Sequence, residues 1–404
     1  MRNFARTQRR PPSDPQEKLL YLMNHYSVSG SSHFQHIVHL LEQIAEQGAH
    51  VLLLIEKADS LPEVHHPNID VVGLRQDLGP AGRWFALASE LNRALRAGYR
   101  TVFVRISVWS ALSAIWACRF GRGKVFFWQS GTTIEFDRAQ KWGRRKLVWF
   151  VRSRLPSKAV WRLVDRFVTG PQSMIDYYDR VGGISRSKIR LLYNDVDHSR
   201  FSWPADERVR LRRKLRASLH LSDDAIVILF VHRLSPVRRT LDYLPLALQR
   251  AKDAGALSDA CVLVAGGGAD LEELKERTER LNLSGAFRFL GDHPNHGIEN
   301  LYAGADIFIQ PSHAEGFPRV LVEAMVSGLP IVTTDAGGSG EILGPLQQRY
   351  VSPKDDPDEF GSALSLMLRS VDTWEALRQE NMAIALRYDT PAVARMYREV
   401  LFGE

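Results

Sequence analysis

Short apolar runs alternate with amphipathic segments along most of the 404-residue chain. The first half holds seven such runs, which begin at residues 18, 49, 69, 101, 125, 166 and 188. Apolar positions in 35–48, between the first two runs, have the spacing of an amphipathic helix. A second series begins at residues 225, 260, 286, 306 and 330. Strands that alternate with helices are typical of parallel sheets covered on both faces, so the pattern predicts two doubly wound α/β domains with Rossmann-like sheets.

A polar, basic segment at 202–224 separates the two series, and we place the domain boundary close to Phe201. The predicted organisation is a disordered basic leader at 1–17, an acceptor-binding domain at 18–200, a donor-binding domain at 201–390 and a helix at 391–404 that returns to the first domain. Open sheets of this kind bind ligands beyond the carboxyl ends of their strands. We therefore expect site residues in loops that follow strands.

Composition narrows the class of protein. The formal charge of +7 and the pI near 9.4 favour an anionic partner, which is a nucleic acid, a membrane surface or a phosphorylated small molecule. The chain has only two cysteines, far apart in the sequence, which argues against a disulfide framework or a zinc cluster. Residues 1–18 lack the order of a signal peptide, and the longest apolar run, 108–118, is too short to span a bilayer. We expect a cytoplasmic protein, either soluble or peripheral to a membrane.

The stretch "SHAEGFPRVLVEAMVSGLPIVTTDAGGSGEIL" at 312–343 places two carboxylates around a predicted strand-to-helix turn. Glu315 lies in the turn, Pro318 suits the first helical position, and Glu323 lies more than one turn into the helix. Amides at a helix start can hold a phosphate, and carboxylates accept paired hydrogen bonds from vicinal hydroxyls. This combination indicates a nucleotide-sugar site. The alternative is a solvated Glu315 and a Glu323 paired with Arg319 at i,i+4, which contributes about 0.2–0.5 kcal/mol.

This stretch closely resembles the corresponding motif of the retaining glycosyltransferases of family four, which have the GT-B fold. In the motif, two glutamates eight positions apart follow "YAGADIFIQPS", and the second opens "EAMVSGLPIVTTDAGGSGEIL". Other similar segments are "VHRLSPVRRTLDYLPLAL", "VLVAGGGADLEELKE", "FRFLGDHP" and "LLYNDVDHSRF", so the resemblance covers most of the chain. It implies two Rossmann-like domains that face each other across a cleft. It also implies retaining transfer of a hexose from a nucleotide sugar of the UDP or GDP type, without a further cofactor and without a metal.

The resemblance also implies roles for single residues. Arg233 and Arg238 would hold the donor diphosphate, Glu315 would contact the transferred sugar, and Glu323 would bind the nucleotide ribose. The remaining donor-binding set is Gly316, Phe317, Pro318, Arg319, Gly30, Gly267 and Leu290.

This sequence departs from the family's pattern at several positions. Arg238 replaces the usual lysine, and its planar guanidinium differs in geometry from a compact ammonium. Arg239 stands where a glycine is usual, Pro318 removes one amide donor, and Gln129 replaces a histidine.

The segment 138–162 suggests the acceptor, because it contains nine lysines and arginines and no acid, interleaved with Trp142, Trp149 and Trp161. Basic residues with aromatic anchors are typical of interfacial segments. We expect an anionic membrane surface as a partner, at the inner face of the cytoplasmic membrane. The acceptor would be a polyprenyl-diphosphate-linked saccharide in surface polysaccharide or glycolipid biosynthesis. Alternatively, these tryptophans pack inside the first domain.

Three other functions stay open at this point. The first is a soluble glycosyltransferase with a small-molecule acceptor. The second is a retaining glycosidase that uses Glu315 and Glu323, which the paired arginines disfavour. The third is a basic nucleic-acid-binding protein. The sequence has no helix-turn-helix, zinc or RNP signature, so we expect no nucleic-acid partner.

Overall fold

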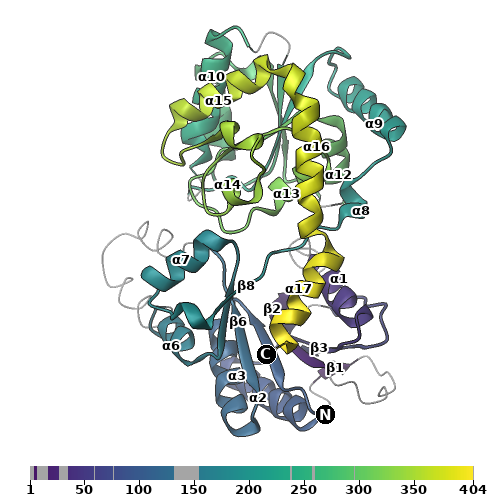
Figure 1. The fold of residues 1–404 in the computed structure, drawn as a ribbon, viewed down its shortest axis with the longest axis vertical. Coiled ribbons are helices and arrows are strands. Elements are labelled where there is room, and N and C mark those ends of the chain that lie inside the picture. The colour runs from purple at the N-terminus through teal and green to yellow at the C-terminus, as the bar shows by residue number, and fades with distance from the viewer. Residues whose placement is uncertain are drawn as a thin grey trace. The chain divides into compact units, whose positions relative to one another are not determined.

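The computed structural model describes residues 4–6, 17–26, 35–58, 60–75, 77–131, 154–236, 239–256, 260–294 and 296–403. The chain divides into two compact units (Figure 1). The first lies within Met1–Ser130, Gln140–Asp195 and Thr390–Glu404, and the second within Gly131–Ala139 and Val196–Asp389. In the described ranges, no helix is long and apolar enough to cross a membrane.

The first unit is built on an eight-stranded sheet with the order β1-β4-β3-β2-β5-β6-β7-β8. Its strands are β1 (Phe4–Arg6), β2 (Lys18–Tyr26), β3 (His50–Ala58), β4 (Ile69–Leu74), β5 (Thr101–Arg105), β6 (Lys124–Trp128), β7 (Arg166–Thr169) and β8 (Ile189–Leu191). All neighbours are parallel except β1, which pairs antiparallel with β4. The strand order changes direction at β2, so β2 and β5 flank the topological switch point.

Helices cover both faces of this sheet. They are α1 (Gln35–Glu46), α2 (Pro80–Arg96), α3 (Val108–Gly121), α6 (Leu155–Leu163), α7 (Gln172–Arg180) and α17 (Thr390–Phe402). Alternate strand residues face opposite sides: Leu20 and Leu22 join the core under α2 and α3, whereas Leu19 and Tyr21 join the core under α1 and α17. The residues of α17 in that second core include Val393, Ala394, Tyr397 and Leu401.

The prediction of a disordered leader at 1–17 is wrong at residues 4–6. Phe4–Arg6 form β1, where the exposed edge of β4 offers backbone groups that a further strand can pair. Glu17 accepts a hydrogen bond of 2.9 Å from Arg398 Nε on α17. The rest of the predicted leader lies outside the described residues.

The second unit has a six-stranded parallel sheet with the order β11-β10-β9-β12-β13-β14. Its strands are β9 (Ile226–Val231), β10 (Ala260–Ala265), β11 (Phe287–Gly291), β12 (Ile307–Gln310), β13 (Ile331–Thr334) and β14 (Val351–Ser352). Its helices are α8 (His198–Phe201), α9 (Ala205–Ser218), α10 (Thr240–Asp253), α11 (Leu271–Arg280), α12 (Ile298–Gly304), α13 (Arg319–Val326), α14 (Ser339–Ile342), α15 (Pro357–Arg369) and α16 (Trp374–Ala385). Two parallel-sheet α/β units confirm the predicted fold class.

A buried ion pair fixes α9 to this second sheet. Arg216 is fully buried and binds Asp306, and it also donates to the carbonyls of Gly304 (2.9 Å) and Ala225 (2.8 Å). Asp306 accepts a further bond of 2.7 Å from the amide of Val227 in β9. Burial raises the pKa of the Asp306 carboxyl, and the two facing arginines oppose this shift. The basic segment at 202–224 is therefore more than a solvated spacer, because one of its arginines belongs to the interior.

Candidate active site

Most of the predicted site residues that the structure describes lie at the carboxyl edge of the second sheet. Strand β9 pairs with β10 on one side and with β12 on the other, and β12 pairs with β13, all in parallel. The carboxyl ends of parallel strands meet at one edge of a sheet, where ligands bind in open α/β folds. The loops that leave these four strands therefore start side by side.

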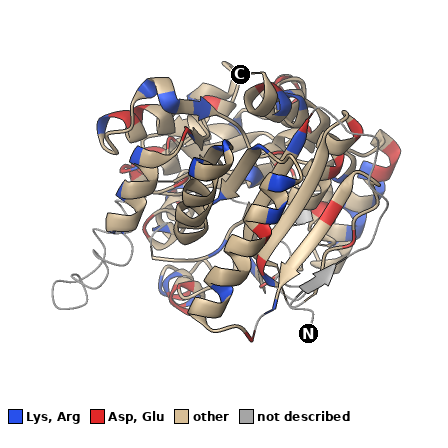
Figure 2. Ribbon diagram, turned by 90° about the horizontal axis from the view of Figure 1, so that it is seen from below, with Lys and Arg blue, Asp and Glu red and all other residues tan. Residues whose placement is uncertain are grey.

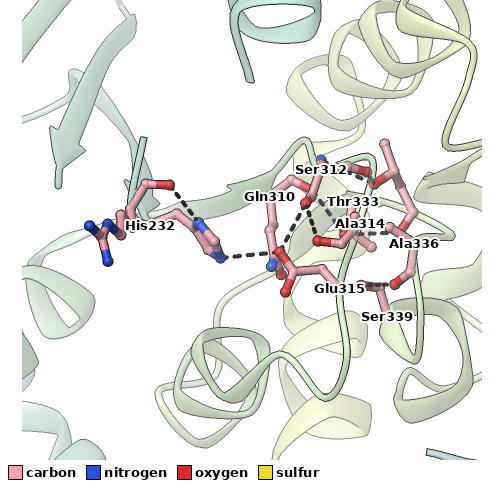
Figure 3. A network of polar contacts seen from close by, with 10 residues as sticks. His232, Gln310, Ser312, Ala314, Glu315, Thr333, Ala336 and Ser339 are labelled. Carbon is pink, nitrogen blue, oxygen red and sulfur yellow. Dashed lines mark hydrogen bonds and ion pairs between the residues drawn. The ribbon is translucent and has the colours of Figure 1, made fainter. Parts of the chain in front are cut away.

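Glu315 is a buried carboxylate held from two of these loops. Its Oε1 accepts a hydrogen bond of 2.9 Å from Ser312 Oγ, in the loop after β12, and lies 3.1 Å from Nε2 of His232, which follows β9 (Figure 3). The side chains of Glu315 and His232 are only 5% and 11% exposed. A carboxylate taken out of water needs such partners to remain ionised, and they fix its orientation.

The imidazole of His232 faces two acceptors. Its Nε2 faces the carboxylate of Glu315, and its Nδ1 lies 3.1 Å from the carbonyl oxygen of Arg233. A neutral ring carries one N–H and satisfies one of these contacts, whereas the protonated ring satisfies both. The backbone of His232 is held in place as well, since the His232 amide donates to the Ala265 carbonyl of β10.

The loop that carries Glu315 has its shape because Gly337 lies against it. Gly337 has φ +59°, and a Cβ there would lie 2.2 Å from the carbonyl oxygen of Glu315. The next residue, Gly338, donates its amide to the carbonyl of Gly316 at 3.1 Å. Any side chain at position 337 would push the loop away, so this glycine is required for the close approach.

Helix α13 begins one residue later than predicted. Pro318 is extended and stands at the N-cap position, where its carbonyl accepts the amide of Leu321 at 3.1 Å, and Arg319 is the first helical residue. Phe317 is buried, with its ring 5.4 Å from that of Tyr388. The positive end of the helix dipole therefore directly follows Glu315, an arrangement suited to an anion.

Glu323, on α13, takes its hydrogen bond from a buried tyrosine. Tyr302 on α12 donates its hydroxyl to Glu323 Oε2 at 2.9 Å, and its ring stacks on Phe308 of β12 at 5.6 Å. Burial, followed by the charge of Glu323, raises the pKa of the Tyr302 hydroxyl well above its ordinary value. The tyrosine therefore stays protonated and serves as a donor that orients Glu323.

Of the two arginines predicted to bind the diphosphate, the structure describes only Arg233. Arg233 is exposed and directly follows His232, which brings its backbone to the edge that holds Glu315. Arg238 lies outside the described residues. Its neighbour Arg239 has φ +55° and pairs with Asp242 at 2.7 Å. This left-handed backbone is one that glycine adopts without strain, which accounts physically for the glycine usual at this position.

Three glycine and leucine positions complete the predicted set. The Gly267 amide donates to Asp292 Oδ1 at 3.1 Å, and the Gly267 carbonyl accepts the Leu234 amide at 2.9 Å, so it lies beside the loop after β9. Leu290 is partly exposed near the end of β11. Gly30 lies outside the described residues.

Sequence reasoning did not single out His232, Ser312, Tyr302 or Gln310. The side chain of Gln310 is almost fully buried, and neither of its amide atoms has a hydrogen-bond partner within the described ranges. Figure 3 shows Gln310 beside His232 and Glu315. A polar residue at the carboxyl end of an apolar strand was the available signal for His232 and Gln310, whereas the contact between Tyr302 and Glu323 depends on how two helices pack.

The basic segment 138–162 is described only from Arg154 onward. Within it, Trp161 on α6 donates its indole N–H to Gln129 Oε1 at 3.0 Å, and its ring lies 5.7 Å from that of Tyr178. Trp161 is half-buried and packs against the core of the first unit, as in the alternative in which these tryptophans belong to that domain. Trp142 and Trp149 lie outside the described residues.

In the part of the chain that the structure describes, no group of three His, Cys, Asp or Glu side chains is placed to hold a metal ion. The carboxylates of Glu315 and Glu323 instead have hydroxyl and imidazole partners.

Both halves of the chain match family models of glycosyltransferases. Residues 34–200 match the family model for Glycosyltransferase Family 4, and residues 212–382 match the model for Glycosyl transferases group 1. A D-inositol 3-phosphate glycosyltransferase of Saccharomonospora viridis is 28% identical over 252 residues, which cover 59% of this chain and 56% of that protein. The matched region spans about half the length of the first curated relatives.

Solved structures with the same fold align over nearly the whole chain. The Anabaena protein Alr3699/HepE, solved in complex with UDP and glucose, gives a TM-score of 0.70 at 18% identity and covers 96% of this chain and 100% of its own. Sucrose-phosphate synthase from Thermosynechococcus elongatus gives a TM-score of 0.72 at 18% identity with the same coverage.

Proposed function

The chain belongs to family four of the glycosyltransferases and has their GT-B fold, and from this premise we propose that it transfers a sugar from a nucleoside-diphosphate sugar to a saccharide acceptor. The observation that carries the proposal is the arrangement around α13. A buried Glu315, oriented by His232 and Ser312, precedes the positive end of the helix, and Glu323, oriented by Tyr302, follows it.

A nucleotide-sugar donor fits this arrangement at three points. The α13 amides and dipole suit the diphosphate, Glu315 suits the hydroxyls of the transferred sugar, and Glu323 suits the ribose. The unpartnered amide of Gln310 offers a further donor and acceptor for a sugar hydroxyl. The Anabaena protein Alr3699/HepE has been solved in complex with UDP and with UDP-glucose, which supports a donor of the UDP type here, with GDP as the alternative.

The proposed reaction retains the configuration of the transferred sugar. The acceptor hydroxyl attacks the anomeric carbon from the face that the diphosphate leaves, and the bond from carbon to phosphate oxygen breaks with its electron pair on the diphosphate. The departing phosphate oxygen takes the proton of the acceptor hydroxyl. Arg233, Arg238 and the α13 amides offset the charge that develops on the leaving group. The mechanism needs neither a protein nucleophile nor a divalent metal.

The acceptor we propose is a saccharide on a polyprenyl diphosphate, used in polysaccharide or glycolipid biosynthesis at the inner face of the cytoplasmic membrane. The net charge of +7 and the nine basic residues of 138–162 support it. A small phosphorylated acceptor is the second candidate, because the curated relatives include D-inositol 3-phosphate glycosyltransferases.

A panel of nucleotide sugars, scored for nucleotide release with each acceptor class and repeated with EDTA, tests the activity. With the true donor, Glu323→Gln should raise KM and Arg233→Ala should mainly lower kcat. The matched control is Glu273→Gln on α11, which should behave as wild type. Unchanged kinetics in both site variants would rule out the assignment, loss of turnover in EDTA would rule out metal independence, and the anomeric configuration of the product decides retention.

A further inference from the structure

Helices α2 and α3 expose a contiguous group of aromatic side chains, which we call the α2–α3 face. Trp84 and Phe85 on α2 and Trp109, Trp116 and Phe120 on α3 are 46–75% exposed. Their ring centroids lie 5.1 Å apart for Trp84 and Phe85, 6.3 Å for Trp84 and Trp116, and 5.6 Å for Trp116 and Phe120. Single exposed apolar residues are common, but a continuous patch of large rings marks an interaction surface.

The sequence of α3 points to the same conclusion independently. Its inner side packs Ala111, Ala114 and Cys118 into the core. Trp116 and Phe120 follow Trp109 by seven and eleven residues, so all three lie on one outer side of the helix. A helix covered on one side by its own domain ordinarily has a polar outer side. The outer side of α3 is apolar as well, so this helix has a second apolar environment.

The charged residues around this face are almost all basic. Lys, Arg, Asp and Glu are interspersed over much of the protein (Figure 2). From Pro80 to Lys124, however, eight lysines and arginines accompany a single acid, Glu90. That glutamate is buried and pairs with Arg93 at 2.8 Å. The one carboxylate of 80–124 is therefore buried, and the exposed Asp77 just before α2 is paired with Arg75, so an approaching surface meets mainly aromatic rings and positive charge.

Three of the arginines form a pocket at the end of the aromatic group. Arg96, Arg100 and Arg122 line a pocket of about 370 Å³ together with Phe120. In the described ranges none of the three is in an ion pair. The helix dipoles account for Arg96 in the last turn of α2 and for Arg122 at the C-cap of α3, but Arg100 lies beyond the helix ends. Guanidinium groups around one pocket suit a phosphate.

We propose that the α2–α3 face is a membrane-contact surface that lies against an anionic bilayer, with its rings at the interface and a lipid phosphate in the arginine pocket. Aromatic rings prefer the level of the headgroups, and nearby arginines are attracted by anionic lipids. A second copy of the chain fits less well, because a two-fold contact through this face would bring arginines against arginines.

This inference deepens the proposed function, since it supplies a way to meet a lipid-borne acceptor. Trp84 and Trp109 also line a pocket of about 610 Å³ at the carboxyl ends of β3 and β5, together with Glu56, Lys57 and Ser107. The aromatic group thus runs from this pocket to the arginine pocket within one unit. A saccharide head group could enter the first pocket while its lipid stays in the bilayer.

Vesicle co-sedimentation of the full chain tests the surface separately from transfer. Wild-type protein should bind vesicles of phosphatidylcholine mixed with phosphatidylglycerol, bind vesicles of phosphatidylcholine alone far less, and lose binding as salt rises. Changing Arg96, Arg100 and Arg122 to glutamate should weaken binding at least tenfold. Trp116→Ser with Phe120→Ser should do the same without a change of charge. The two variants therefore test the positive charge and the aromatic rings separately.

The matched control changes the exposed Arg210, Arg213 and Lys214 of α9 to glutamate, which alters the charge equally on another unit and should leave binding intact. Nucleotide binding, measured on every variant, reports that the second unit is folded. Circular dichroism reports the whole chain, so a lost signal with nucleotide binding intact places the unfolding in the first unit. Arg96→Gln with Arg122→Gln provides a milder pair if the triple variant unfolds.

Four results would overturn the proposal. The first is equal sedimentation with and without anionic lipid, and the second is wild-type vesicle binding by the α2–α3 variants. The third is an equal loss of vesicle binding in the α9 control. The fourth is a loss of vesicle binding only when Arg144, Arg145 and Lys146 become glutamate. A dimer that Trp116→Ser disrupts, in a protein that ignores lipid, would assign the face to a second copy. Transfer activity with no lipid binding would refute the surface alone, and lipid binding with no transfer would refute the function alone.

Discussion

Replacing Tyr302 by phenylalanine removes the hydroxyl that donates to Glu323 in the proposed donor site, together with a longer contact of 3.5 Å to the Val320 carbonyl. The hydroxyl donates to Glu323 Oε2 at 2.9 Å, and the ring, which stacks on Phe308, keeps its place in the variant. Tyr302 is fully buried, so no water replaces the lost hydroxyl at the carboxylate. If Glu323 binds the ribose, its orientation by Tyr302 contributes to nucleotide affinity.

The size of the effect follows from the chemistry of the bond. A hydrogen bond to a charged group contributes about 1.5–3 kcal/mol. Each 1.4 kcal/mol corresponds to a factor of ten in affinity. We therefore expect Tyr302→Phe to weaken binding of the nucleotide about 10- to 150-fold, with a similar rise in donor KM and a smaller change in kcat.

Calorimetric titration of UDP and GDP into each variant measures the affinity. Tyr350→Phe is the matched control, because Tyr350 is a fully buried tyrosine of the same unit whose hydroxyl lies 3.4 Å from Thr373 Oγ1. It should lower stability slightly and leave nucleotide affinity unchanged. The double variant with Glu323→Gln should bind no more weakly than Glu323→Gln alone. Wild-type affinity in Tyr302→Phe, or additive losses in the double variant, would refute the reasoning.

Three further changes test the rest of the structure. Arg216→Ala should lower the free energy of unfolding by about 3–5 kcal/mol, because it breaks a buried ion pair and leaves only the more exposed Arg212 beside the Asp306 carboxylate, whereas Arg213→Ala on the same helix should change it by less than about 0.5 kcal/mol in urea denaturation. Burial raises the pKa of the Glu56 carboxyl above 4.5, so the charged form costs stability at neutral pH; Glu56→Gln should stabilise the protein there, and a gain that persists below pH 4.5 would contradict this. Deleting residues 391–404 should expose the core beneath α17 and lower the melting temperature of the first unit, and a truncated protein that melts like wild type would exclude this.

The apolar runs predicted the strands wherever burial on both faces made them continuous. Strand β4 covers 69–74 as predicted, because four of its six residues are aliphatic and polar residues flank it. The two-residue strand β14 is too short for any periodicity, and β1 depends on an edge that belongs to a distant strand. Pattern alone cannot locate strands whose partners decide their conformation.

The candidate site shows the same limit at the level of side chains. The loop position of Glu315 follows from the strand before it, so the sequence was sufficient to find it. Its partner His232 lies 83 positions earlier in the chain and meets it only because β9 and β12 are neighbours in the sheet. Trp161 shows the converse, because a basic and aromatic composition suits both a bilayer and a domain interior, and only its contacts with Gln129 and Tyr178 decide between them.

The placement of α17 in the core of the first unit has a consequence for synthesis on the ribosome. The second unit, Val196–Asp389, is nearly continuous in the chain and can fold once it has emerged. The first unit cannot, because Tyr397 and Leu401 complete the core beneath α1 and are translated after all of Val196–Asp389. At bacterial or eukaryotic elongation rates this delay is about 10–40 s. Throughout that time the nascent first unit has an uncovered apolar surface, so we expect this half of the protein to need protection from aggregation during translation.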